Sequence, residues 1–325
     1  MSEGVFVAPA SSANVGPGYD VFAIALEKPT LKLEVVVEEG EGVAVEVVGR
    51  YRNEVPEDPL LNSAAKAASH LLKTRNIKKE VRLTVEASIP PRKGLGASGA
   101  EAAAAVFALN RLLGLGFSAD ELVVAAAAAE PGGHLDNVSA SIFGGFVICL
   151  RDELGSKIIS VSPPPDLGLI VVVPDIVKES TASARKALPP MVDMSAHVQV
   201  ASRVGAAAAA VCKGDVRLLL RSVVIDPLVE CLRADAGVYG KGVTRESLLE
   251  EKRLLFRRYG VAEVISGAGP SRLLLFDRRE NAGEFGRRKV DEALAEVIHR
   301  LEKTGAKILE TIETNPSPHG VRQIG

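Results

Sequence analysis

The chain of 325 residues is 47% hydrophobic and carries a formal net charge of −2. Its length favours two domains, because a typical domain has about 150 residues. Acidic and basic residues are mixed along the chain without a basic stripe, so we expect no nucleic-acid partner. We also expect no membrane span, because no apolar run reaches about 18 residues.

The cysteines and the first residues bear on the cellular compartment. Cys149, Cys212 and Cys231 are scattered and form no C-x-x-C pair, which favours a reducing environment without structural zinc. The N-terminus lacks the basic start and apolar core of a secretory signal. We therefore expect a cytoplasmic protein.

Hydrophobic periodicity in the first half predicts strands interrupted by helices. In chain order we expect strands at 4–9 and 21–26, a hairpin within 31–49 that breaks at Gly40–Gly42, a helix at 60–74, a strand at 81–89, helices at 98–113 and 118–130, and a strand at 142–150. Early antiparallel strands with later helices favour an α+β fold over a doubly wound sheet.

A proline run, SPPPDLG at 162–168, indicates a boundary between domains at 1–162 and 163–325. In the second half we expect a strand at 167–174, helices at 195–214 and 246–260, a strand pair within 262–277, a helix within 281–305 and a strand at 306–314. Paired strands with helices on one face suggest a split βαβ, ferredoxin-like domain.

The loop PPRKGLGASGA at 90–100 is the strongest functional signal in the chain. It joins a predicted strand to an Ala-rich helix, where free backbone N–H groups and the helix dipole attract anions. Gly94, Gly96 and Gly99 carry no side chains that would keep a phosphate away from the backbone.

Three interpretations of this loop remain open from the residues alone. The first is a corner without ligand, in which Ser98 is the helix N-cap and Glu101 completes a capping box. The second is dinucleotide binding through G-x-G-x-x-G, although a second helix follows where a βαβ unit needs a strand. The third is a nucleoside triphosphate site that lacks the Walker Gly-Lys-Ser/Thr ending.

Five segments resemble, in order, the motifs of the GHMP small-molecule kinases, and most closely those of the homoserine kinases. They are APASSANVGPGYDVFAIAL at 8–26, the loop at 90–100, HLDNVSASIFGGF at 134–146, STASARKALP at 180–189 and ISGAGPS at 265–271. This resemblance implies a two-domain α+β fold, with an S5-like N-terminal domain, a ferredoxin-like C-terminal domain, and ATP and substrate between them.

The resemblance further implies ATP- and Mg²⁺-dependent phosphorylation of the side-chain hydroxyl of L-homoserine to O-phospho-L-homoserine, a step of threonine biosynthesis, by a homodimer. In this family the loop binds the ATP phosphates. Its residues here are Pro90, Pro91, Arg92, Lys93, Gly94, Leu95, Gly96, Ala97, Ser98, Gly99 and Ala100. Ser98 and Glu130 match the family's magnesium ligands, and both supply the oxygen donors that Mg²⁺ prefers.

The resemblance places Asn137 beside the reacting hydroxyl. It can position that hydroxyl but cannot accept its proton, and Asp136 is the alternative base. The remaining substrate-binding candidates are Asn14, Asp20, His134, Thr181 and Arg185. Asp20 suits the substrate ammonium group, and the planar fork of Arg185 suits its carboxylate.

Several residues depart from the family pattern. Ala97 replaces a serine, Glu101 replaces a small residue, and only three residues separate Glu130 from His134. The position of a second substrate arginine holds another residue type, and Arg233 lies four residues further on. Two other functions therefore stay open: a GHMP kinase for another hydroxy acid (mevalonate, shikimate or pantoate), and a non-catalytic GHMP-fold protein.

Overall fold

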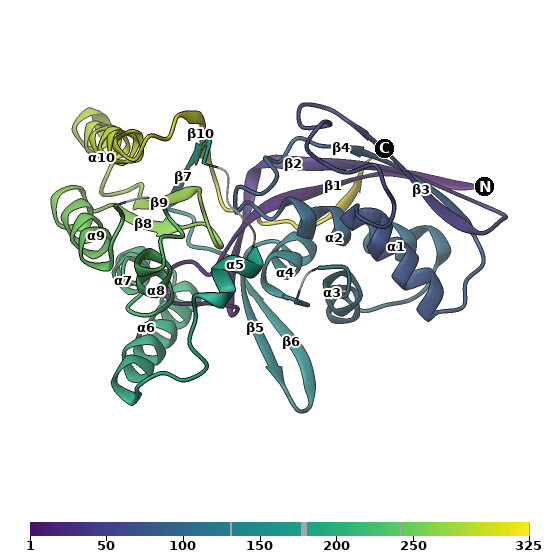
Figure 1. Ribbon diagram of the computed structural model, residues 1–325, viewed down its shortest axis with the longest axis horizontal. Coiled ribbons are helices and arrows are strands. Elements are labelled where there is room, and N and C mark those ends of the chain that lie inside the picture. The colour runs from purple at the N-terminus through teal and green to yellow at the C-terminus, as the bar shows by residue number, and fades with distance from the viewer. Residues whose placement is uncertain (131, 177–180, 241, 325) are drawn as a thin grey trace.

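The computed structural model describes residues 1–130, 132–176, 181–240 and 242–324. Two β-sheets, one from each half of the chain, organise this described part (Figure 1). The first sheet has seven strands: β1 (Ser2–Ala13), β2 (Phe22–Glu38), β3 (Gly42–Val48), β4 (Glu80–Glu86), β5 (Phe146–Asp152), β6 (Gly155–Val161) and β11 (Arg322–Ile324).

Four helices cover one face of the first sheet: α1 (Ser63–Thr74), α2 (Ala97–Leu113), α3 (Ala119–Ala127) and α4 (Asp136–Phe143). Helix α2 contacts β1, β2 and all three other helices of this layer. Its run of alanines makes this possible, since small side chains let the neighbouring elements approach from several directions. Helix α2 is therefore packed on several sides.

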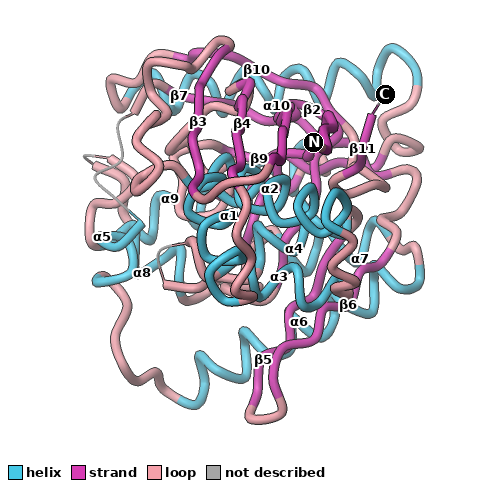
Figure 2. The backbone as a smooth tube through the Cα atoms, turned by 90° about the vertical axis from the view of Figure 1, so that its right-hand side faces the viewer, coloured by secondary structure: helices cyan, strands magenta, loops and turns pink. Residues whose placement is uncertain are grey.

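The expected hairpin within 31–49 is wrong. Strands β2 and β3 do not pair with each other, because β4 lies between them, antiparallel to β2 and parallel to β3. The expected strand at 142–150 starts late, at Phe146, because Ile142 and Phe143 belong to α4. Strand β5 instead forms a hairpin with β6, which projects from the body of the molecule (Figure 2).

The second sheet has the antiparallel order β10 (Ile308–Thr314), β7 (Leu167–Pro174), β9 (Arg272–Asp277) and β8 (Ala262–Ile265). Taken in chain order, this is the 4-1-3-2 arrangement of a ferredoxin-like domain, which confirms the predicted fold class. The helices of this half are α5 (Thr181–Lys186), α6 (Met194–Lys213), α7 (Val216–Val223), α8 (Val229–Asp235), α9 (Arg245–Tyr259) and α10 (Gly283–Lys303).

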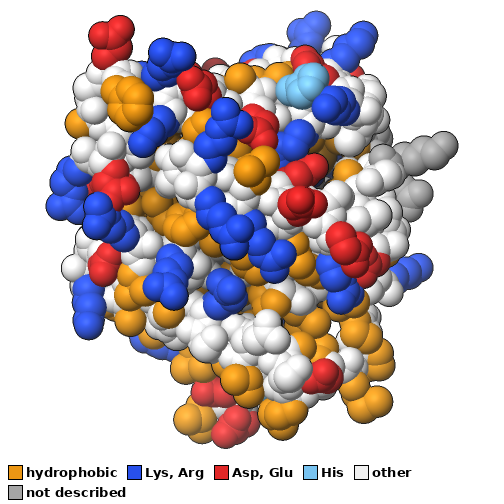
Figure 3. Space-filling model, turned by 90° about the vertical axis from the view of Figure 1, so that its left-hand side faces the viewer, with side chains coloured by type: hydrophobic (Ala, Val, Ile, Leu, Met, Phe, Trp, Pro, Cys, Tyr) orange, Lys and Arg blue, Asp and Glu red, His pale blue; other side chains and the backbone are white. Residues whose placement is uncertain are grey.

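Helices cover both faces of the second sheet rather than the one face expected. Leu169 and Val171 of β7 pack in the core that includes α6 and α7, whereas Ile170 and Val172 pack in the core of α9 and α10. Because alternate residues of a strand point to opposite faces, β7 is buried throughout. On the outer face of this half, basic and acidic side chains are interspersed (Figure 3).

The two halves share a continuous apolar core that includes residues of both sheets. The end of the chain also returns to the first sheet, where β11 pairs with β1 and Pro316 bridges to Leu26. A domain boundary at 162/163 stays a proposal, with the final residues joining the first half. Among the described helices, none combines the length and apolar character that a membrane crossing requires.

Candidate active site

A cavity of about 470 Å³ lies where the two halves meet. Its wall contains the turn between β1 and β2, the phosphate loop at 90–100, the starts of α1 and α4, and side chains of α5 and α8. The expected site residues in this wall are Asn14, Asp20, Pro91, Arg92, Gly94, Leu95, Gly96, Ala97, Ser98, Glu130, His134, Asn137 and Arg185. Segments far apart in the sequence therefore converge on one hollow.

The phosphate loop presents a helix N-terminus to this cavity. Gly96 has a φ of 67° and precedes α2, and no side chain caps the helix there. The interpretation of Ser98 as an N-cap is therefore wrong, and the first N–H groups of α2 are available to an anion. Lys93 is turned elsewhere, since its ammonium group donates a hydrogen bond to the carbonyl of Ile176 at 3.0 Å.

The second glycine loop, at 266–271, contacts the phosphate loop and supports it. The hydroxyl of Ser266 donates to the carbonyl of Gly94 at 2.6 Å, and the N–H of Gly267 donates to Ala13 at 3.0 Å. Gly94 has a φ of 79°, and a Cβ there would overlap the carbonyl oxygen of Ser266. Only glycine fits this crossing, so the two loops hold each other in place.

Ser98 and two glutamates form an oxygen-rich wall next to the phosphate loop. The hydroxyl of Ser98 donates to Glu130 at 2.9 Å, and the other carboxylate oxygen of Glu130 is buried without a hydrogen-bond partner in the described part of the chain. Burial raises the pKa of Glu130. Burial and the charge of Glu130 together raise the pKa of Glu101 to about 8.

This wall fits a hard divalent cation, because carboxylate and hydroxyl oxygens are the donors that Mg²⁺ takes. The described residues contain no group of three or more His, Cys, Asp or Glu side chains arranged to hold a metal ion. A cation beside Ser98 and Glu130 would therefore complete its coordination with phosphate oxygens and water.

Asn137 lies in the first turn of α4 and faces the phosphate loop. Its amide oxygen accepts a hydrogen bond from Ser11 at 2.8 Å, which orients the amide nitrogen as a donor. Asp136 is 4% exposed, and one of its carboxylate oxygens accepts the N–H of Asn137 at 2.8 Å. Burial raises the pKa of Asp136 to about 6.

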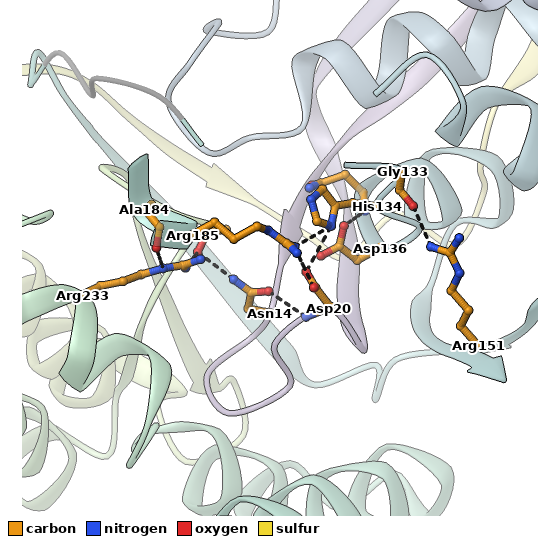
Figure 4. A network of polar contacts seen from close by, with 11 residues as sticks. Asn14, Asp20, Gly133, His134, Asp136, Arg151, Ala184, Arg185 and Arg233 are labelled. Carbon is orange, nitrogen blue, oxygen red and sulfur yellow. Dashed lines mark hydrogen bonds and ion pairs between the residues drawn. The ribbon is translucent and has the colours of Figure 1, made fainter. Parts of the chain in front are cut away.

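A charged cluster of Asp20, His134 and Arg185 also lies in the wall of the cavity (Figure 4). Arg185 donates to a carboxylate oxygen of Asp20 at 2.7 Å and lies 2.7 Å from Nδ1 of His134, which is 3.3 Å from Asp20. Burial raises the pKa of Asp20, but the hydrogen bonds and charges of His134 and Arg185 outweigh burial and hold that pKa below its usual value.

Asn14 organises the turn that carries Asp20. Its amide nitrogen donates to Gly267 at 2.8 Å, and its amide oxygen accepts the N–H of Asp20 at 3.2 Å. Asn14 and Asp20 have φ values of 70° and 57°, which asparagine and aspartate tolerate better than most residues. Asn14 therefore links the β1–β2 turn to the second glycine loop.

Arg233 of α8 also reaches the cavity wall, although the sequence did not align it with a substrate arginine. Its side chain is buried, and its Nε donates to the carbonyl of Ala184 at 3.1 Å. The position of Arg233 in the site depends on packing between α5 and α8, which no sequence motif encodes. The side chain of Thr181 lies outside the described residues.

Four expected loop residues stand outside the cavity wall: Pro90, Lys93, Gly99 and Ala100. Gly99 instead allows α2 to approach α4, because a Cβ there would lie 3.2 Å from that of Asn137. Sequence reasoning missed three contributors to the site. Ser11 orients Asn137, Tyr19 lies beneath Arg185 and Arg233, and Ser63 stands next to Glu101 and Glu130.

Known proteins are similar to this chain in sequence and in fold. The family description "GHMP kinases N terminal domain" matches residues 62–145. The homoserine kinase of Thermoplasma volcanium is 33% identical over 87% of each chain. That of Methanocella arvoryzae is 36% identical over 88% of this chain and 90% of its own.

Solved structures agree with this fold. A homoserine kinase from Cytophaga hutchinsonii superimposes with a TM-score of 0.82 and 24% identity, over 100% of this chain and 98% of the other. Mevalonate diphosphate decarboxylase from Staphylococcus aureus gives a TM-score of 0.73 at 17% identity, over 100% and 98% of the two chains. At these identities the likeness concerns the fold alone.

Proposed function

The chain belongs to the GHMP kinase family, and we propose that it is a homoserine kinase. It transfers the γ-phosphate of ATP to the side-chain hydroxyl of L-homoserine, giving O-phospho-L-homoserine and ADP. The observation that carries this acceptor is the pairing of Asp20 with Arg185 in the wall of the same cavity that contains the phosphate loop. A zwitterionic amino acid offers complementary charges to both residues.

The triphosphate is bound by the uncapped start of α2. The backbone N–H groups of the loop at 94–99 and the dipole of α2 stabilise negative charge without the cost of reorganisation. Because the second glycine loop fixes Gly94, these donors are in place before ATP arrives. Phosphoryl transfer depends mainly on such positioning and charge neutralisation.

Ser98 and Glu130 are the proposed ligands of Mg²⁺. The fit rests on the buried carboxylate oxygen of Glu130 that has no hydrogen-bond partner among the described residues and on the hydroxyl of Ser98 that contacts the same carboxylate. When bound, the ion would neutralise charge on the β- and γ-phosphates.

The acceptor is bound beside the charged cluster in the wall of the cavity. Asp20 pairs with the substrate ammonium group, and Arg185 and Arg233 bind the carboxylate, with His134 beside them. The amide of Asn137, oriented by Ser11, donates to the reacting hydroxyl and positions it. Asn137 cannot accept the hydroxyl proton, and Asp136 is the neighbouring carboxylate that can.

An acceptor panel tests the proposed function. The chain is incubated with Mg²⁺ and ATP, and ADP release is measured with homoserine, mevalonate, pantoate, shikimate or no acceptor. We expect release that depends on homoserine. Release with another acceptor alone would reassign the substrate, and no release with any acceptor would indicate a non-catalytic protein. A cytoplasmic location and a homodimer are further proposals from the family resemblance.

A further inference from the structure

Glu101 occupies an unusual place for a carboxylate. It lies one helical turn after Ser98, so both side chains project from the same face of α2. Glu101 is only 5% exposed, yet it contributes to the wall of the cavity beside Ser98 and Glu130. A carboxylate buried to this degree requires compensating partners, and the backbone N–H of Ser63 at the start of α1 supplies one.

No cationic side chain of the described residues forms an ion pair with Glu101 or Glu130. Lys66 and His134 act on Glu130 only through their charges. When ionised, two carboxylates repel each other and a triphosphate in the same cavity, and a cation between them would offset this repulsion. The buried oxygen of Glu130 that has no hydrogen-bond partner among the described residues is available to bind such a cation.

We propose that Glu101 is a third protein ligand of the divalent cation, beside Ser98 and Glu130. This proposal rests on the function proposed above, since the cation would accompany ATP. It adds a second carboxylate to the site and explains why an acidic side chain is tolerated one turn from the phosphates. Oxygen ligands from a carboxylate pair and from phosphates are the set that Mg²⁺ and Mn²⁺ accept.

Binding of Mn²⁺, measured by electron paramagnetic resonance in the presence of β,γ-imido-ATP, tests this proposal without catalysis. The variants are Glu101→Gln, Glu130→Gln and, as a control, Glu153→Gln in the exposed β5–β6 turn. We expect Glu101→Gln to weaken Mn²⁺ binding about tenfold or more, as loss of groups around a metal commonly does. Glu153→Gln should bind Mn²⁺ like the unmodified chain.

A second measurement separates ligation from repulsion. Calorimetry with β,γ-imido-ATP in EDTA reports nucleotide binding without metal, and circular dichroism checks that each variant is folded. If Glu101 only repels phosphate, Glu101→Gln should strengthen nucleotide binding with and without Mn²⁺, which would overturn the proposal. Unchanged Mn²⁺ affinity in Glu101→Gln alone would also overturn it. Unchanged affinity in both Glu101→Gln and Glu130→Gln would instead contradict the metal site of the proposed function.

Discussion

The guanidinium groups of Arg185 and Arg233 both lie over the ring of Tyr19, at 5.4 and 5.3 Å from its centroid. The two arginines come from α5 and α8, and Tyr19 comes from the β1–β2 turn. A ring face attracts cations, so Tyr19 holds two positive charges near each other despite their repulsion. We propose that the two arginines bind one substrate carboxylate there.

Arg233 should contribute to acceptor binding rather than to chemistry. We expect Arg233→Ala and Arg185→Ala each to raise the KM for homoserine about 10- to 100-fold, since a hydrogen bond to a charged group is worth about 1.5–3 kcal/mol. The KM for ATP should change little. Steady-state kinetics check this, with Arg75→Ala, at the surface over Phe117, as the control. An unchanged homoserine KM in Arg233→Ala would remove this residue from the acceptor site.

We expect the loss of the Asn137 side chain to lower kcat. Asn137→Ala is expected to lower kcat about 100-fold, because the donor that positions the hydroxyl is lost. Ser98→Ala should lower kcat to a similar degree. Ser11→Ala should have a smaller effect, since Asn137 then keeps its donor but loses its orientation. Single-turnover rates with saturating homoserine measure these changes, and near-normal turnover of Asn137→Ala would refute its assignment.

The crossing of the two glycine loops can be tested with a matched pair of glycines. Gly94 and Gly114 have φ values of 79° and 63°, so alanine costs about 1–2 kcal/mol of backbone strain at either position. Only at Gly94 would the new Cβ also overlap Ser266, whereas it meets nothing at Gly114. We expect Gly94→Ala to weaken ATP binding strongly and Gly114→Ala to leave it intact. Equal ATP affinities in calorimetry would show that the crossing does not shape the phosphate site.

Asp226 gives a prediction for stability against pH. Its carboxylate caps the start of α8, and burial followed by the charge of Glu230 raises its pKa to about 6. In the unfolded chain this carboxyl group loses its proton near pH 4, which is a lower pH than in the folded chain. This group's contribution to stability is therefore present below about pH 4 and is lost as pH rises to about 6.

Urea unfolding at pH 4 and pH 6.5 measures this effect. The free energy of unfolding of Asp226→Asn, relative to the unmodified chain, should rise by about 2 kcal/mol between these pH values. Asp215→Asn, which replaces the exposed N-cap of α7, is the control for exchanging a capping carboxylate for an amide. A pH-independent difference for Asp226→Asn would mean that the carboxyl group titrates normally in the folded protein.

Local patterns predicted much of this fold. The Ala-rich segment after the phosphate loop forms α2, and the expected strand at 167–174 forms β7. The pairing of β3 with β4 could not be predicted, because alternation specifies which face a residue occupies but not which strand lies beside it. Helix α4 was missed because its eight residues are too short to show a helical period.

The site was partly predictable for similar reasons. Motif residues such as Asp20, Asn137 and Arg185 do converge on one cavity. Arg233 could not be placed from sequence, since its position depends on how α8 packs against α5. Glu101 stood out as a departure from the family pattern, but its burial beside Glu130 became evident only when α2 and the end of α3 were placed together.

A crystal structure of this chain with β,γ-imido-ATP, Mg²⁺ and homoserine would show both substrates in the cavity. We predict that the triphosphate contacts the backbone N–H groups at 94–99 and that the homoserine hydroxyl lies within hydrogen-bond distance of Asn137 and faces the γ-phosphate. A triphosphate bound away from the start of α2, or a homoserine bound away from Asp20 and Arg185, would contradict this prediction.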